Sequence, residues 1–254
     1  MNTQDNTILI TGGGSGIGRA LAEAFHALGN QVIISGRSPK TLDETTAANP
    51  GMKSLTVDMT DEASIRAFAA KLEAEFPKLN VLINNAGIMR PENLLSGEGG
   101  TTDAEAMILT NLLGPIRLIH ALLPLLRKQP QASVVNVTSG LAFIPLAMTP
   151  TYCATKAAMH SYTESLRHQL RETTVEVLEL APPYVATHLM GEQQAADPRA
   201  MPLDDFIAEV MEIFKTQPTP KEILVKRVEP LRFAVAGGAE NYAKVFEGLN
   251  SMVY

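Results

Sequence analysis

The fold is decided by the segment Ile8-Leu9-Ile10-Thr11-Gly12-Gly13-Gly14-Ser15-Gly16-Ile17-Gly18, close to the amino terminus. Its apolar start is typical of a buried strand, and the residues that follow the glycines carry helical spacing. Gly12, Gly16 and Gly18 allow the chain to turn sharply, approach a phosphate closely and enter a helix whose N-terminus favours anions. Glycine-rich turns also occur without any ligand. The position of this one between a strand and a helix favours a dinucleotide-binding site.

Short apolar, β-branched runs alternate with longer helical patterns as far as Leu180. We expect strands at Ile8–Ile10, Val32–Ser35, Ser54–Val57, Val81–Ile83, Ser133–Val137 and Val175–Leu180. We expect helices at Gly16–Leu28, Ser64–Phe76, Ala104–Leu126 and Tyr152–Arg171. This alternation predicts an α/β fold, a doubly wound, Rossmann-like parallel sheet with helices on both faces. Residues 1–254 are expected to form one domain, as α/β chains of ~200–250 residues often do.

The regular pattern weakens after Ala181. Residues 187–220 are rich in Met, Gln, Ala and Pro and are expected to form a mobile helical flap over the substrate. A last strand is predicted at Glu222–Val228, and a helix in the tail up to Tyr254. The composition of Ser96–Thr102 predicts a flexible loop.

The composition narrows the class of protein. The chain has 45% apolar residues, a net charge of −6 and a single cysteine, Cys153. A negative chain without basic runs argues against a nucleic-acid partner. The amino terminus lacks a secretory signal, and the apolar stretch Leu118–Leu126 is interrupted by His120 and Pro124 and is too short to span a bilayer. We therefore expect a cytoplasmic protein with no membrane partner.

The second predicted strand bears on which nicotinamide cofactor would bind. Enzymes for NAD(H) tend to place an acidic residue ~20 residues beyond the glycine-rich turn, where it holds the ribose hydroxyls. This chain has no carboxylate there and offers Arg37 and Ser38 instead. A guanidinium suits a 2′-phosphate through bidentate geometry, so NADP(H) is favoured. The alternative is that Arg37 is a solvated loop residue and the cofactor is NAD(H).

Tyr152 and Lys156 are four residues apart in a segment with helical spacing, so they lie on one helix face. A phenol normally ionises near pH ~10 and is a poor proton carrier at neutral pH. A neighbouring cation favours the phenolate and brings its pKa toward the working range. This pair, together with the glycine-rich turn, predicts hydride transfer with tyrosine as the acid or base.

Together, these motifs resemble the short-chain dehydrogenase/reductase family, in its compact single-domain branch. The resemblance runs from about Asn6 to about Thr187 and rests on motifs that agree in order and spacing: Thr11–Gly18, Asp58, Asn84-Asn85-Ala86-Gly87, Asn111, Ser139 and Tyr152–Lys156. Within the family, the chain is similar to a bacterial subgroup of oxidoreductases associated with D-alanine transfer to teichoic acids. That likeness implies little about the substrate.

The resemblance implies a role for each matching residue. Tyr152 would be the general acid in carbonyl reduction and the base in alcohol oxidation, Lys156 would lower its pKa, and Ser139 would polarise the substrate oxygen. Asn111 would hold a water that links Lys156 to solvent. Pro115 supports that role, because it has no N–H to donate to the Asn111 carbonyl; a simple packing kink is the alternative. Cofactor contacts are implied for Gly12, Gly14, Ser15, Gly16, Ile17, Gly18, Asp58, Met59, Asn85, Ala86, Gly87, Tyr152, Lys156, Pro182, Val185 and Thr187.

Two features depart from the family pattern. Pro183 stands where a glycine is usual, so the loop that leads to Thr187 can take another path. The usual carboxyl-terminal strand is missing, and the apolar faces of Ala104–Leu126 and Tyr152–Arg171 suggest a homodimer rather than a tetramer. The five histidines show neither metal-ligand spacing nor carboxylate clustering, so no metal is expected.

The uncharged stretch Leu141–Leu146 should face the substrate. We therefore expect an apolar small-molecule carbonyl or alcohol, and an NADP(H)-dependent oxidoreductase. Two alternatives remain at this point: the same reaction with NAD(H), and a non-catalytic, cofactor-binding regulatory or scaffold protein.

Overall fold

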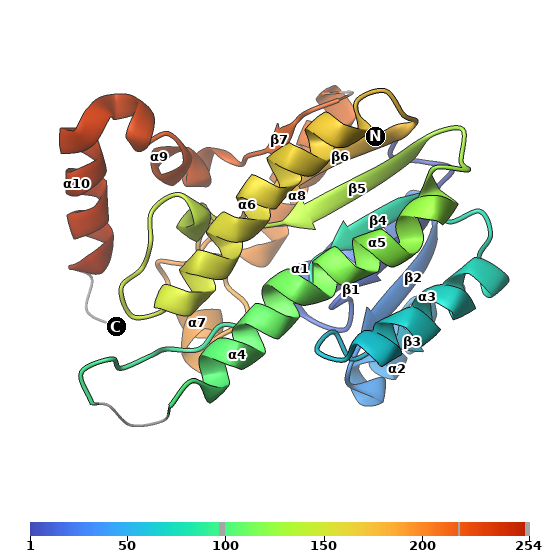
Figure 1. The fold of residues 1–254 in the computed structure, drawn as a ribbon, viewed down its shortest axis with the longest axis horizontal. Coiled ribbons are helices and arrows are strands. Elements are labelled where there is room, and N and C mark those ends of the chain that lie inside the picture. The colour runs from blue at the N-terminus through green and yellow to red at the C-terminus, as the bar shows by residue number, and fades with distance from the viewer. Residues whose placement is uncertain (97–99, 218, 252–254) are drawn as a thin grey trace.

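A parallel sheet of seven strands forms the centre of the protein in the computed structural model, which describes residues 1–96, 100–217 and 219–251 (Figure 1). The strand order is β3-β2-β1-β4-β5-β6-β7. The order reverses next to β1, so the chain winds outward in both directions and the sheet is doubly wound. The strands are β1 (Thr7–Thr11), β2 (Gln31–Gly36), β3 (Lys53–Thr56), β4 (Val81–Asn84), β5 (Ala132–Val137), β6 (Val175–Leu180) and β7 (Glu222–Ile223).

Helices cover both faces of this sheet, as the sequence predicts. One face carries α1 (Gly16–Ala27), α2 (Pro39–Ala48) and α8 (Leu203–Thr216), and the other carries α3 (Glu62–Glu75), α5 (Gly114–Leu126) and α6 (Pro150–Leu170). The remaining helices lie at the edges: α4 (Thr102–Ile108), α7 (Glu192–Ala196), α9 (Glu229–Arg232) and α10 (Gly238–Asn250).

Alternate residues of each central strand enter different cores. Ile8 and Ile10 of β1 pack toward α1 and α8, whereas Leu9 between them packs toward α3 and α5. β2 divides in the same way, with Ile33 on the second face. Side chains of a strand point alternately to its two sides, so a strand covered by helices on both sides must be apolar throughout.

Two element assignments from the sequence are corrected by the structure. A helix, α2, joins β2 to β3, although we predicted none there; Ser38 accepts a hydrogen bond from the Thr41 N–H at its start, and Pro39 occupies the first helical turn. The predicted strand Glu222–Val228 is only Glu222–Ile223, because Val228 turns back in a short 3₁₀ helix to become fully buried.

The range predicted as a flap, 187–220, includes a helix that packs in the core. α8, which lies inside the range 187–220, buries Phe206, Val210 and Phe214 against α1. This packing ties α8 to the core, and the mobility of 187–220 stays a prediction. The part that borders the cleft is the segment that contains α7. Residues 97–99 of the predicted loop and 252–254 of the predicted tail helix lie outside the described residues.

The predicted helix Ala104–Leu126 is interrupted by a π-helical turn, Leu109–Leu113, between α4 and α5. By length and hydropathy, Thr102–Leu126 resembles a membrane span, yet 44% of its most apolar window is buried within the protein. Leu118, Leu122 and Leu126 of α5 lie in the core beside α3. Such packing is that of a helix in a folded core, so its hydropathy is explained without a membrane.

Truncation of a core side chain between sheet and helix should be costly. Leu72 of α3 is fully buried, so Leu72→Ala is expected to lower the free energy of unfolding by about 3 kcal/mol, as buried leucine truncations do. The matched control is Leu95→Ala, since Leu95 is 99% exposed and its loss should change stability little. Urea denaturation followed by circular dichroism measures both; equal midpoints would contradict the assigned core.

Candidate active site

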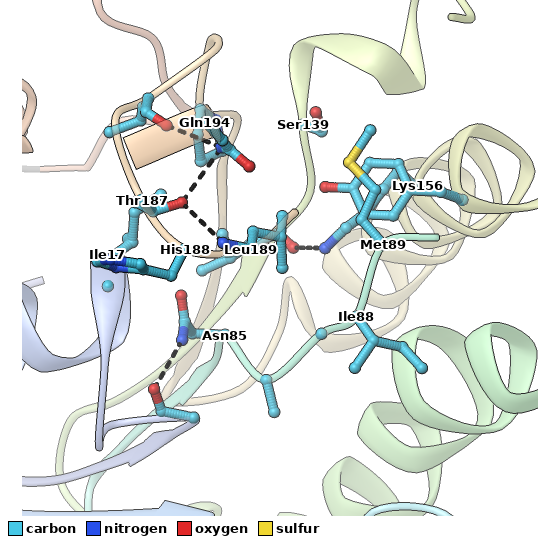
Figure 2. Close-up of a pocket in the computed structure, with 18 of the residues that line it drawn as sticks. Ile17, Asn85, Ile88, Met89, Ser139, Lys156, Thr187, His188, Leu189 and Gln194 are labelled. Carbon is cyan, nitrogen blue, oxygen red and sulfur yellow. Dashed lines mark hydrogen bonds between the residues drawn. The ribbon is translucent and has the colours of Figure 1, made fainter. Parts of the chain in front are cut away.

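A cleft of about 370 Å³ opens at the carboxyl ends of β1, β4 and β5 (Figure 2). Ligands of doubly wound sheets bind at the carboxyl edge where the strand order reverses, which here is between β1 and β4. Its walls carry many of the predicted cofactor contacts: Gly12, Ser15, Gly16, Ile17, Asn85, Ala86, Gly87, Tyr152, Lys156, Pro182, Val185 and Thr187.

The glycine-rich turn has the geometry of a close backbone approach. Gly12 and Gly16 adopt φ values of +68° and +51°, which side chains rarely allow. A Cβ on Gly18 would lie 2.3 Å from the Gly12 carbonyl oxygen and 2.3 Å from Asn85 Nδ2. The Asn85 amide in turn donates to the Thr11 carbonyl at 3.0 Å. These contacts hold the start of α1 against the loop after β4 and leave its N-terminus open to an anion.

Gly14 is placed differently from the other predicted contacts. A Cβ there would lie 2.7 Å from Thr41 Oγ1 of α2, and Gly14 is not part of the cleft wall. The absence of a side chain at Gly14 is therefore explained by helix packing, which does not exclude a backbone contact to a ligand.

The residues predicted to meet the adenosine end lie beyond the cleft wall. Arg37 is exposed and close enough to Asp58 to help lower the pKa of that carboxyl, after the two hydrogen bonds from Thr60 that lower it most. Ser38 caps α2. Met59 is buried, and its backbone carbonyl oxygen packs closely against Gly114. Arg37, Ser38 and Asp58 thus follow the ends of β2 and β3, whereas the Met59 side chain belongs to the core, and the cofactor contacts of all four stay predictions.

Ser139, Tyr152 and Lys156 meet in the inner part of the cleft. Ser139 follows β5, and the other two residues lie in the first turns of α6. All three are at least 92% buried. The Ser139 hydroxyl is close enough to Tyr152 to oppose the rise of its pKa, and the Lys156 ammonium lies 5.6 Å from the centre of the tyrosine ring. The i, i+4 spacing in the sequence thus places an acid and a cation in one pocket.

The ionisation of this pair differs from the expectation in one respect. Burial raises the pKa of Tyr152 above its ordinary value, and the Ser139 hydrogen bond offsets only part of that rise. Burial also lowers the pKa of Lys156 to about 8, against the opposing effect of Glu179. The lysine donates to the Val137 carbonyl at 2.8 Å, not to the phenol. The lowering of the tyrosine pKa by Lys156 therefore remains a prediction for the cofactor-bound protein.

Asn111 connects the elements around the lysine. Its amide donates to the Ile88 carbonyl at 2.8 Å and accepts from the Ile88 N–H at 2.9 Å, which pins the loop after β4. It also contacts Thr155 Oγ1 on α6 at 3.3 Å. The π-helical turn that contains Asn111 ends two residues before Pro115, which has no N–H to donate to the Asn111 carbonyl. Asn111 does not line the cleft, so its water relay remains a prediction.

Thr187 lies opposite the glycine-rich turn, despite the proline at position 183. It is 92% buried, and Gln194 of α7 donates to its hydroxyl at 3.2 Å and to the Val185 carbonyl at 2.8 Å. Figure 2 shows this group facing Ile17 and Asn85 across the cleft. The role of Gln194 was not predicted, because its contacts depend on how α7 folds back.

A second cavity of about 760 Å³ adjoins the cleft and shares Ser139 and Tyr152 with it. Its walls are largely apolar and include Leu141 and Leu146, as the sequence predicts, together with Met148, Leu189, Met190, Leu231 and Leu249. Two ion pairs border the cavity, Arg90–Asp103 at 3.2 Å and Arg199–Asp197 at 2.7 Å. Leu249 comes from the carboxyl-terminal helix α10. Its place in the cavity wall was not predicted from the spacing of residues in the sequence.

A buried polar cluster behind Ser139 corrects the interpretation of the histidines. His160 on α6 lies within 4.8 Å of Glu179 on β6 and Glu222 on β7, measured between their ligand atoms. We expected no carboxylate near any histidine, because the three residues are far apart in the sequence. The signal that was available is Glu179 itself, a carboxylate between two leucines in a mostly apolar strand.

Comparison with known proteins identifies the class. The model of the short chain dehydrogenase family matches residues 6–198. The uncharacterized oxidoreductase DltE of Bacillus subtilis is 41% identical over 255 residues, which cover 99% of both chains. The chain belongs to the short-chain dehydrogenase family, an oxidoreductase family that uses nicotinamide cofactors, and this confirms the resemblance seen in the motifs.

Solved structures agree with this fold. A short-chain dehydrogenase from Streptomyces avermitilis superposes with a TM-score of 0.81 at 27% identity, covering 97% of this chain and 100% of the other. A serine dehydrogenase solved with NADP+ gives a TM-score of 0.74 at 27% identity, covering 85% and 91%.

Replacement of the most confined glycine of the turn tests the cleft. Gly18→Ala is expected to weaken nicotinamide nucleotide binding at least ten-fold, because its Cβ would push the Gly12 backbone and the Asn85 amide from their places. Gly248→Ala is the control, since a Cβ there meets nothing within 4 Å. Fluorescence titration with NADPH measures both; unchanged affinity in Gly18→Ala would contradict the assigned cofactor cleft.

Proposed function

We propose that the protein is an NADP(H)-dependent oxidoreductase that interconverts an apolar ketone or aldehyde and the corresponding alcohol, with Tyr152 as acid and base. The observation that carries this proposal is the position of Ser139 and Tyr152, which lie in the wall shared by the nucleotide cleft and the apolar cavity. A substrate carbonyl in the cavity would meet both hydroxyls at the point where the two spaces join.

The chain fits a dinucleotide. The positive φ of Gly12 and Gly16 and the close contacts of Gly18 form a cradle with no room for side chains, at the N-terminus of α1. Thr187 and Val185 lie on the opposite wall and would meet the nicotinamide. When bound, the cofactor supplies or accepts the hydride.

The proton is handled by the protein. The high pKa of Tyr152 keeps the phenol protonated at neutral pH, so it can donate to the substrate oxygen during reduction. The Ser139 hydroxyl donates to the same oxygen and favours the negative charge that develops there. Lys156, with a pKa of about 8, is largely protonated at neutral pH and stabilises the phenolate that forms. For alcohol oxidation the same phenolate is the base.

The preference for NADP(H) rests on the end of β2. Arg37 is exposed beside Asp58, and within the described chain it makes no hydrogen bond or ion pair that would compete for its guanidinium. Such a group is available to bind a 2′-phosphate in bidentate fashion. The structural relative that was solved with NADP+ supports the same choice.

The substrate class rests on the lining of the larger cavity. Leucine and methionine side chains dominate its walls, and the two arginines that border it are paired with aspartates. Among the described residues that line this cavity, no unpaired cation is therefore available to hold a phosphate or carboxylate. A bulky apolar carbonyl compound gains the most from burial in such a space.

Substitution of the tyrosine tests the chemistry directly. Tyr152→Phe removes only the hydroxyl and is expected to lower kcat for carbonyl reduction by roughly 10²–10⁴-fold, the usual contribution of general acid catalysis. NADPH affinity should stay within about three-fold, because the ring still fills its place. The measurement is the rate of NADPH oxidation with a panel of apolar ketones and aldehydes. Turnover retained in Tyr152→Phe would refute the assigned role.

The cofactor preference has a separate test. Arg37→Ala is expected to raise the Kd for NADPH by roughly ten- to hundred-fold, the value of charge-assisted hydrogen bonds to one phosphate. The Kd for NADH should hardly move, since NADH has no 2′-phosphate. Equal effects on both would contradict the role of Arg37. Failure of the wild-type protein to bind either cofactor would favour a non-enzymatic role.

We also place the protein in the cytoplasm as a homodimer. Both α5 and α6 carry partly exposed apolar residues beside the buried ones, such as Ile116 and Leu123 on α5 and Tyr162 on α6. An apolar surface of this kind on two adjacent helices favours self-association.

A further inference from the structure

Glu179 is a fully buried carboxylate directly behind the proposed active site. It lies in β6, between the buried Leu178 and Leu180. A buried charge is strongly unfavourable unless it is paired and hydrogen-bonded. Both of its oxygens are engaged: the Thr138 hydroxyl donates to Oε1 at 2.6 Å, and His160 Nδ1 lies 2.8 Å from Oε2. An aliphatic residue would fill this strand position without such partners, so the carboxylate needs an explanation.

Thr138 connects the carboxylate to the reacting groups. It lies between Val137, whose carbonyl accepts a hydrogen bond from the Lys156 ammonium, and Ser139, which lines the same cleft as Tyr152. A hydrogen bond that holds Thr138 therefore holds the backbone on both sides of it. Burial lowers the pKa of Lys156, and the negative charge of Glu179 opposes part of that lowering.

The charged groups around Glu179 come from three elements. From α6 come His160, which contacts Glu179, Glu164, which lies 4.0 Å from His160, and Lys156. β7 supplies Glu222, and α9 supplies Arg232. Arg232 holds both oxygens of Glu222 at 2.7 and 3.1 Å and stacks on the Phe143 ring, which in turn contacts His160. The cluster thus supplies its own cations, so a metal ion is not needed to explain it.

We propose that Glu179 is a positioning residue for the reaction proposed above: through Thr138 it fixes the chain that presents Ser139 and holds Lys156, and it places a negative charge behind that chain. The contact with His160 offsets part of the free-energy cost of burying the Glu179 carboxylate. The inference rests on the proposed function for its kinetic consequences. The Thr138 hydrogen bond to Glu179 carries the positioning, and the effect of the Glu179 charge on Lys156 is measured separately.

The charge of Glu179 is tested by Glu179→Gln, which keeps the shape and an acceptor oxygen for Thr138, while its NH2 group can donate to a neutral His160. Without the negative charge Lys156 should lose its proton at a lower pH. Because the protonated lysine is the form that stabilises phenolate, the alkaline limb of the kcat profile for carbonyl reduction should move to lower pH. The second readout is the pH dependence of Lys156 acetylation by acetic anhydride, followed by peptide mass spectrometry, whose midpoint should fall in the same direction.

The mechanical link is tested at Thr138. Thr138→Val keeps the shape but removes the hydroxyl, and kcat is expected to fall roughly ten- to hundred-fold as Ser139 loses its alignment. Thr138→Ser restores the hydroxyl and should recover most of the rate. This pair also carries the test if Glu179→Gln fails to fold.

The matched control is Glu176→Gln, on the same strand, whose carboxylate pairs with the terminal amino group at 2.7 Å, away from the cleft. It should leave both profiles unmoved. Unchanged kinetics and acetylation in Glu179→Gln would overturn the proposal, as would a uniform rate loss with an unmoved acetylation midpoint, which indicates a structural defect only. A wild-type protein without carbonyl turnover would refute the proposed function, while the acetylation midpoint would still decide the role of Glu179.

Discussion

The burial of the Lys156 ammonium is the interaction on which the rest of the site depends. A cation at the inner end of a cleft requires a fixed acceptor, and the carbonyl at the end of β5 provides it at 2.8 Å. That contact ties the first turns of α6 to the strand that leads into Ser139. Tyr152, one helical turn before the lysine, is then carried into the same pocket. A shift of α6 along the sheet would separate all three groups at once.

The doubly wound topology explains how distant segments meet around this cation. In a parallel sheet the carboxyl ends of all strands lie on one edge, so the loops after β1, β4 and β5 converge there. Hydrogen bonds between these loops make the edge rigid: the Thr11 hydroxyl accepts from the N–H groups of Asn85 and Ala86, both at 3.0 Å. The glycine turn, the loop after β4 and the catalytic groups are thereby held in one frame.

The fold and the inner site were predictable because their signals are local. The glycine triplet, the alternation of apolar runs and the four-residue spacing of Tyr152 and Lys156 each arise within a few turns of chain. The predictions failed where long-range packing decides. The composition of α8 predicted a flap, yet its buried side chains pack in the core against α1. β7 ends after two residues because Val228 finds a buried position, and α2 escaped notice because its buried face is only Leu42 and Thr45.

The sequence by itself determined the class of fold and the strand–turn–helix unit, and it singled out the side chains proposed to react, because periodicity and glycine placement act through the local backbone. The tertiary structure alone decided the environment of those side chains. Burial raises the pKa of Tyr152 and lowers that of Lys156, and burial is a property of the assembled protein. The meeting of His160, Glu179 and Glu222 likewise depends on strand pairing, since β7 brings Glu222 beside Glu179 across 42 residues of intervening chain. Electrostatic interactions act over distances in space, and only the folded chain sets those distances.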